Sequence, residues 1–114
     1  GKAVKSCLVL AAQANGAEVL TVKGLTYDDA LGIRLAEEFV QCGSVQCGYC
    51  IPGMIAAAKY YIDKGGKADR KAIRQAISGN LCRCTGYNKI VTAIYNVAAE
   101  TNQSNNTKQE AVKL

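Results

Sequence analysis

The spacing of apolar residues along this chain changes near residue 26. Before that point, apolar residues surround Cys7, and a short strand-like run follows at residues 19–22. From Thr26 onward, apolar residues recur every three or four positions, which is typical of a helix that buries one face. The pattern therefore predicts a segment with a short strand over residues 1–25 and a helical domain over residues 26–99.

Four amphipathic helices are predicted in the helical domain. Pro52 suits the first turn of a helix, where its missing N–H would have had no partner, and Asp69 can cap the helix that follows it. Short loops join the helices, so the expected fold class is all-α, a small four-helix bundle. The first predicted helix begins at Thr26, which suits an N-cap with Asp29 in an acidic first turn, and ends near Gly43. The other predicted spans are Pro52 to Gly65, Asp69 to Gly79, and Tyr87 or Asn88 to about Ala99.

The C-terminal residues 100–114 read ETNQSNNTKQEAVKL. The stretch is polar and has no repeating apolar position. Such a segment can bury little apolar surface to offset the entropy lost on ordering. We therefore expect a disordered polar tail after the fourth helix.

Composition limits the classes of function. With 114 residues and 49% hydrophobic content, the chain suits one globular domain. Histidine is absent, which excludes mixed Cys/His metal sites and histidine acid–base catalysis. No apolar run approaches the roughly 20 residues that span a bilayer, and no secretory signal is visible, which predicts a cytoplasmic protein without membrane insertion. The chain opens at Gly1 without a Met, as expected of a processed or truncated product.

The net charge of +5 is mild. The basic residues between Lys64 and Arg74 have no aromatic residues among them, unlike a typical nucleic-acid surface. We expect no nucleic-acid partner. A solvated helix face or a docking patch for an acidic protein are the two interpretations of this region.

Four of the six cysteines form two close pairs. Cys47 and Cys50 lie in CGYC, and Cys82 and Cys84 lie in CRC, each pair just before a predicted helix. A bundle can bring two helix N-termini to one end, where unpaired N–H groups and the helix dipole stabilise thiolates. Four thiolates at one place can bind one [2Fe–2S] cluster.

The cysteines have two other interpretations, a disulfide framework and a zinc site. A disulfide framework belongs to secreted domains too small to build a core, whereas this chain has the apolar residues to build one. A four-cysteine zinc site usually uses two C-x₂-C pairs, and the C-x-C pair here is unusually tight for zinc. The spacing favours the iron–sulfur cluster and leaves a zinc-stapled helical interaction module as the alternative.

Longer stretches around the cysteines carry a family resemblance. FVQCGSVQCGYCIPGMI at residues 39–55 and ISGNLCRCTGY at residues 77–87 resemble the C-terminal [2Fe–2S] domain of the molybdenum hydroxylases, the family of xanthine dehydrogenase, aldehyde oxidoreductase and aerobic carbon monoxide dehydrogenase. The resemblance covers residues 1 to about 99. It implies an electron-transfer subunit that has no catalytic residue of its own and relays electrons from a molybdenum–pterin centre towards FAD or another acceptor.

The resemblance also implies ligands and partners. The cofactor on this chain would be one [2Fe–2S] cluster, with a molybdopterin-type cofactor on a large partner subunit and FAD on a medium one. Gln46 and Cys84 would contact the pterin, although Gln46 could instead bond the backbone of its own loop. The implied cluster ligands are Cys47, Cys50, Cys82 and Cys84.

Residues 1–25 resemble the end of a β-rich, plant-ferredoxin-like domain. Its VxSC motif is matched by residues 4–7, and Cys7 would be the final ligand of a first cluster. The other three ligands of that cluster would lie upstream, and they are absent from this chain. The resemblance thus implies a chain truncated at its N-terminus, with only a remnant of that domain.

Several residues around the motifs carry separate expectations. Ile51 stands where relatives usually have Thr, so the helix at Pro52 would lack a hydroxyl N-cap. Cys42 is extra; its C-x₄-C spacing to Cys47 imitates a ferredoxin motif, but we expect a thiol at a helix end. Tyr87 and Asn80 are expected to shape the loops. Close approach of the backbone to sulfur is expected at Gly48, Gly53 and Gly86.

Overall fold

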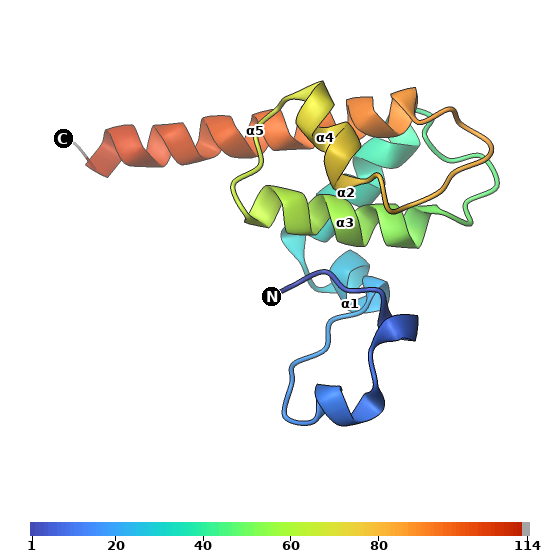
Figure 1. The fold of residues 1–114 in the computed structure, drawn as a ribbon. Coiled ribbons are helices and arrows are strands. Elements are labelled where there is room, and N and C mark those ends of the chain that lie inside the picture. Colours follow the sequence, from blue (N-terminus) through green and yellow to red (C-terminus); the bar gives the residue numbers. More distant parts are fainter. Residues whose placement is uncertain (113–114) are drawn as a thin grey trace.

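Helices account for every regular element in the part of the chain that the computed structural model describes, which is the backbone of residues 1–112 and the side chains of residues 1–105. The all-α prediction is confirmed. None of these helices combines the length and apolarity needed to cross a membrane. The helices are α1 (Val22–Tyr27), α2 (Ala30–Gln41), α3 (Ile51–Asp63), α4 (Arg70–Ala76) and α5 (Asn88–Val112) (Figure 1).

The first half of α5 is the centre of the core. It packs against α2, α3 and α4, while its second half extends past the other helices (Figure 1). Full burial of each Leu, Ile or Phe side chain stabilises the fold by about 1.5–3 kcal/mol. The fully buried large apolar side chains come from all four of these helices: Leu35, Phe39, Met54, Ile73, Ile90, Val91, Ile94 and Val97.

The first predicted helix is broken into α1 and α2. Asp29 is the N-cap of α2, because its Oδ2 accepts a hydrogen bond from the Gly32 N–H at 2.7 Å. The expected cap at Thr26 is wrong: its hydroxyl donates to the Val22 carbonyl inside α1 at 3.0 Å. A methyl group at Gly32 would overlap the Leu25 carbonyl oxygen, so this glycine allows α1 to pack directly against α2.

The starts of α3 and α4 agree with the sequence. Pro52 lies in the first turn of α3, and Asp69 Oδ1 accepts from the Lys71 N–H at 3.1 Å at the start of α4. One detail is corrected: the N-cap of α3 is Cys50, and Ile51 is the first helical residue. A hydroxyl at position 51 would therefore not stand at the capping position.

The N-terminal segment contains no strand. Residues 1–21 form two short 3₁₀ turns, Ser6–Leu8 and Ala11–Ala14, joined by extended, exposed backbone. The prediction of a strand at residues 19–22 is wrong, and the β-rich remnant is not seen. A lone strand has no neighbour with which to form a ladder, and Val22 already belongs to α1. A domain boundary at residue 25 stays a prediction.

The predicted tail also differs from the structure. α5 continues without a break from the core to Val112, so residues 100–112 are helical. Contacts past Ala99 support the extension: Arg34 on α2 pairs with Glu100 at 2.7 Å, and the Thr101 hydroxyl bonds the Val97 carbonyl at 3.0 Å. Once a helix is nucleated, each added residue contributes one more backbone hydrogen bond. The tail prediction for residues 113–114 lies outside the described residues.

Candidate metal centre

Two loops meet at one end of the bundle. The loop from α2 to α3 carries CGYC, and the loop from α4 to α5 carries CRC (right-hand end of Figure 1). Cys50 is the N-cap of α3, and CRC lies a few residues before α5. Both loops are therefore at helix N-termini, where the backbone presents N–H groups and positive partial charge.

The four cysteines pair across the two loops. The Cys50 thiol is in hydrogen-bonding contact with that of Cys82, and the Cys47 thiol is in such contact with that of Cys84. Among the described residues, no three Cys, Asp or Glu side chains converge on the position of a single ion. Tetrahedral zinc needs all four sulfurs about 2.3 Å from one point, whereas a two-iron cluster takes two thiolates on each iron. Pairing of the thiols across the two loops is the arrangement that two irons with two thiolates each require.

The two pairs differ in burial. The Cys82 residue is 8% exposed, and Cys50 is half-buried beside it. Cys47 and Cys84 are exposed. We call Cys50 and Cys82 the inner pair, and Cys47 and Cys84 the outer pair. The site therefore has one side inside the bundle and one side at the surface.

The two thiols of the inner pair differ in pKa. A hydrogen bond from the Thr85 hydroxyl, together with backbone N–H groups of Thr85 and Cys84, lowers the pKa of Cys82 to about 7. Burial, and then the neighbouring Cys82 sulfur, raises the pKa of Cys50 to about 11. Cys82 is thus the thiol of this pair that ionises first. Since metals bind thiolates, loading of the inner pair releases protons and depends on pH.

The outer pair is also coupled. The hydrogen bond between the Cys84 and Cys47 thiols, together with the charge of Cys47, raises the pKa of Cys84. Two thiols sharing one hydrogen bond cannot both ionise easily unless a cation lies between them.

Tyr87 closes the CRC loop. Its hydroxyl accepts a hydrogen bond from the Cys82 N–H at 3.0 Å, and its own N–H donates to Thr85 Oγ1 at 3.2 Å. Tyr87 has a φ of 70°, a left-handed conformation that is uncommon for a bulky residue. Backbone outliers of this kind persist where the surroundings hold them, often at functional sites. The expectation that Tyr87 shapes the loop agrees with these contacts.

Glycines at the site serve two different purposes. Gly48 and Gly86 have φ of 83° and 71°, so they supply left-handed turns beside the cysteines. Gly53 instead admits a side chain of the other loop: a methyl group there would lie 2.9 Å from Oδ1 of Asn80. This contact brings the second loop onto the first turn of α3, and the expected approach of the Gly53 backbone to sulfur stays a prediction.

Gln46 lies beside the outer pair. It is exposed, and it forms no hydrogen bond with another described residue. The alternative that Gln46 bonds its own loop is therefore not seen. Large apolar side chains of the two cysteine loops also face solvent: Tyr49 is 94% exposed and Leu81 is 80% exposed.

The CGYC loop is anchored to α5 through Ser44. This residue is fully buried, and its hydroxyl donates to the Lys89 carbonyl at 2.9 Å. Lys89 lies in the first turn of α5. The anchor fixes the start of the loop that carries Cys47 and Cys50 relative to the helix that follows CRC.

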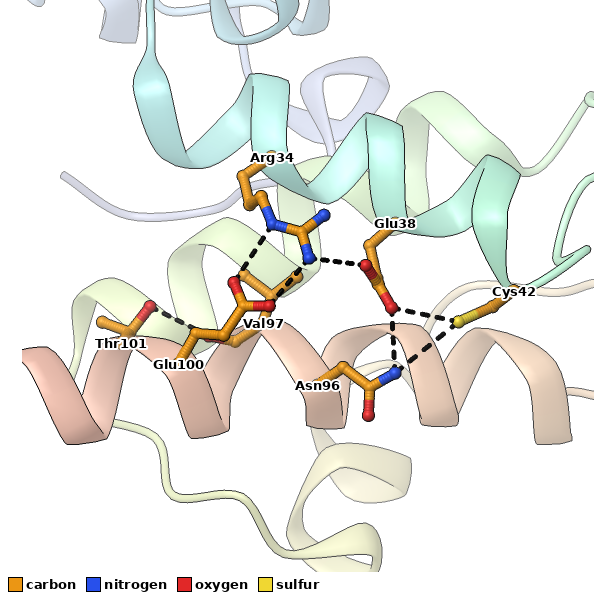
Figure 2. Close-up of polar contacts among 7 residues, drawn as sticks. All are labelled: Arg34, Glu38, Cys42, Asn96, Val97, Glu100 and Thr101. Carbon is orange, nitrogen blue, oxygen red and sulfur yellow. Dashed lines mark hydrogen bonds and ion pairs between the residues drawn. The ribbon is translucent and has the colours of Figure 1, made fainter.

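Cys42 belongs to a different group of contacts. It is the C-cap residue of α2, which confirms the expected helix-end position. Its thiol donates to Glu38 Oε1 at 3.3 Å, and the Asn96 side-chain amide lies 3.7 Å from its sulfur (Figure 2). Burial, and then Glu38, raises the pKa of this thiol. Such a thiol is held protonated, unlike a metal ligand.

Cys7 lies apart from the other candidates. It is exposed in the first 3₁₀ turn and contacts no other predicted ligand among the described side chains. The structure therefore brings four of the five predicted metal ligands together and leaves Cys7 outside.

Two features of the region escaped the sequence analysis. Thr85 contacts the Cys82 sulfur at 3.0 Å; its spacing, three residues after a ligand, was a usable signal. A buried carboxylate, Glu38, joins Arg34, Asn96 and Glu100 between α2 and α5 (Figure 2). The spacing of four between Arg34 and Glu38 is a local signal for their ion pair, but their contacts with Asn96 and Glu100 on α5 join residues far apart in the sequence.

Together, the fold and the paired thiols define a helical domain with four cysteines from two loops at one end. The chain belongs to the [2Fe–2S] binding domain family, whose model matches residues 21–95.

Relatives with assigned functions share this domain. The chain is 45% identical over 94 residues to the nicotinate dehydrogenase small FeS subunit of Eubacterium barkeri, covering 82% of this chain and 59% of the relative. It is 40% identical over 99 residues to the xanthine dehydrogenase iron-sulfur-binding subunit of Escherichia coli O157:H7, covering 82% and 60%. The chain thus spans about three fifths of the length of these curated relatives.

A solved structure agrees with the fold. The quinoline 2-oxidoreductase of Pseudomonas putida 86 superposes with a TM-score of 0.77 at 39% sequence identity, covering 88% of this chain and 62% of that chain. The likeness extends over nearly all of the helical domain and supports its architecture.

Proposed function

We propose that Cys47, Cys50, Cys82 and Cys84 hold one [2Fe–2S] cluster. The observation that carries this proposal is the pairing of the thiols across the two loops. The inner pair would bind one iron and the outer pair the other. The donor set fits: four thiols, two helix N-termini, and one thiol with a pKa of about 7. When bound, the cluster accepts and releases one electron at a time.

The role of the chain would be to relay electrons inside a molybdenum-dependent oxidoreductase. Because Cys47 and Cys84 are exposed, the outer side of the cluster would be within reach of a partner subunit. The relatives include iron–sulfur subunits of dehydrogenases, which supports this role. Substrate chemistry would take place on the partner, and this chain would place and tune the cluster.

The outer surface suits a partner that carries the pterin. Gln46 offers an exposed amide with no partner among the described residues, and it adjoins Cys47. We propose that Gln46 and Cys84 contact a molybdopterin-type cofactor on the large subunit. Exposed apolar side chains in the same two loops, Tyr49 and Leu81, are typical of a surface that a partner covers.

Further members of the enzyme follow from the resemblance. FAD would lie on another subunit and receive the electrons. Cys7 would ligate a separate cluster together with cysteines that are not in this chain; its exposure fits that role. A cytoplasmic location stays a prediction.

Metal analysis tests the proposal. Protein purified without oxygen should contain two irons and two acid-labile sulfides for this site, with an EPR signal that arises only on reduction. If the protein carries a further cluster, the signal that a Cys50→Ser variant loses identifies this one. Stoichiometric zinc without iron in the wild-type protein would instead support the zinc-stapled interaction module.

A further inference from the structure

We propose that Thr85 tunes the cluster: its hydroxyl donates a hydrogen bond to the Cys82 sulfur and thereby raises the reduction potential. The inference rests on the proposed [2Fe–2S] site. The contact is short, with Thr85 Oγ1 3.0 Å from Cys82 Sγ. Thr85 would act through this ligand, so it is a positioning residue for electron transfer.

The ionisation state of the ligand fixes the direction of the bond. Either atom could donate on distance alone, but the Tyr87 N–H already donates to Thr85 Oγ1 at 3.2 Å. The hydroxyl oxygen is therefore used as an acceptor, and its one proton is free to point at sulfur. A cysteine bound to iron is a thiolate and has no proton to donate. With the cluster present, Thr85 must be the donor.

The bond is held in place by the loop. Tyr87 is fixed by the hydrogen bond from the Cys82 N–H to its hydroxyl at 3.0 Å, and its carbonyl accepts from the Val91 N–H at 2.9 Å in α5. Thr85 Oγ1 thus lies between two groups that are themselves anchored. Thr85 is half-buried and Cys82 is buried, so solvent screens their interaction less than it would at the surface.

The charge on the cluster makes the bond sensitive to redox state. Two ferric irons, two sulfides and four thiolates sum to about −2, and reduction of one iron to the ferrous state by one electron brings the sum to about −3. No proton is taken up in this step. A donor to a ligand sulfur stabilises the more negative state more strongly, so it favours reduction. The N–H groups of Thr85 and Cys84 contact the same sulfur, but only the hydroxyl can be removed by substitution.

Three variants test the inference. Thr85→Val removes the hydroxyl and keeps the shape, Thr85→Ser keeps the hydroxyl, and Thr101→Val is the matched control, because its hydroxyl bonds a carbonyl of α5 about 20 Å along the helix from its first residue. The measurement is an EPR-monitored titration with dithionite on the protein as isolated. At a fixed potential we expect the ratio of reduced to oxidised cluster to fall about tenfold in Thr85→Val, a shift of about 59 mV for one electron. Thr85→Ser and Thr101→Val should match the wild type.

The outcomes separate this inference from the proposed function. A Thr85→Val protein with an intact cluster and the wild-type potential would overturn the tuning role and leave the cluster assignment in place. Wild-type protein without iron would instead overturn the cluster itself. If Thr85→Val loses its cluster, the Thr85→Ala variant decides. A lowered reduction potential in Thr85→Ala supports the tuning role. Loss of the cluster in both variants, while Thr85→Ser keeps it, shows that the hydroxyl is structural and overturns the tuning role.

Discussion

Asn96 on α5 donates a hydrogen bond of 2.9 Å to the buried carboxylate of Glu38 on α2, although the two residues are 58 positions apart in the sequence (Figure 2). The other oxygen of Glu38 accepts from Arg34 at 2.6 Å, and Arg34 also bonds Glu100. Glu38 is 6% exposed, so its charge needs these partners. The group joins the two helices close to the C-terminal end of α2, from which the CGYC loop departs.

Removal of the Glu38 carboxylate should therefore loosen the contact between α2 and α5. Glu38→Ala leaves the Asn96 amide without its acceptor, and Arg34 keeps only Glu100. We expect a loss of about 1–3 kcal/mol in the free energy of unfolding, measured by denaturant titration. The matched control is Glu37→Ala on the exposed side of the same helix, which should change stability by no more than about 0.5 kcal/mol. Equal effects of the two substitutions would show that the buried group contributes nothing.

The same carboxylate gives stability a dependence on pH. The hydrogen bond from Asn96 holds the pKa of Glu38 below its usual range; burial opposes this, and Arg34 supports it. A lowered pKa in the folded state stabilises the fold above the unfolded pKa of about 4.3, and this contribution is lost as pH falls through the folded value. The difference in unfolding free energy between wild type and Glu38→Gln should thus narrow below about pH 4. A difference that stays constant down to pH 3 would contradict the assignment.

Tyr87 should matter for the lifetime of the cluster. Tyr87→Phe keeps the ring but removes the acceptor of the Cys82 N–H, a hydrogen bond worth about 1 kcal/mol. We expect the visible absorbance of the cluster to bleach several-fold faster in the presence of an iron chelator. Tyr60→Phe is the control, since Tyr60 lies on α3, where its ring contacts Lys64. Identical bleaching rates in all three proteins would mean that Tyr87 does not hold the CRC loop.

A variant of Gln46 distinguishes binding of the cluster from electron transfer into the cluster. In the assembled enzyme, Gln46→Ala should leave iron content and the EPR spectrum unchanged, because Gln46 bonds no described residue. Reduction of the cluster by substrate, followed by stopped flow, should slow about fivefold, the equivalent of one hydrogen bond of about 1 kcal/mol. Gln41→Ala, exposed at the end of α2, should have no effect. An unchanged rate in Gln46→Ala would refute a contact with the pterin.

The sequence predicted those helix starts that depend only on neighbouring residues. Pro52 and Asp69 mark the starts of α3 and α4 because first-turn and capping preferences act within a few residues. Thr26 and Asp29 both carry oxygens that can cap a helix, but Thr26 lies inside α1 and Asp29 caps α2, a division into two helices that the apolar spacing did not predict. The continuation of α5 past Ala99 was missed because its support comes from α2, far back in the sequence.

In the site, too, some features were predictable from the sequence and others depend on the fold. Spacing indicated CGYC and CRC as candidate ligand pairs, but it could not say that Cys50 meets Cys82 and Cys47 meets Cys84, since this depends on how two loops 30 or more residues apart are placed. Thr85 was within reach of sequence reasoning, because a hydroxyl three residues after a ligand can bend back to it.

The central claim, four ligand cysteines and two bystanders, is tested most directly by iron and sulfide content together with EPR in single Cys→Ser variants. Serine at Cys7 or Cys42 should leave the cluster of this domain at full iron content with an unchanged spectrum, because the Cys42 thiol is held by Glu38 and Cys7 lies elsewhere. Serine at any member of the inner or outer pair should lose the cluster or change its spectrum grossly. A Cys42→Ser protein without the cluster, alongside a Cys84→Ser protein that keeps it, would contradict the account.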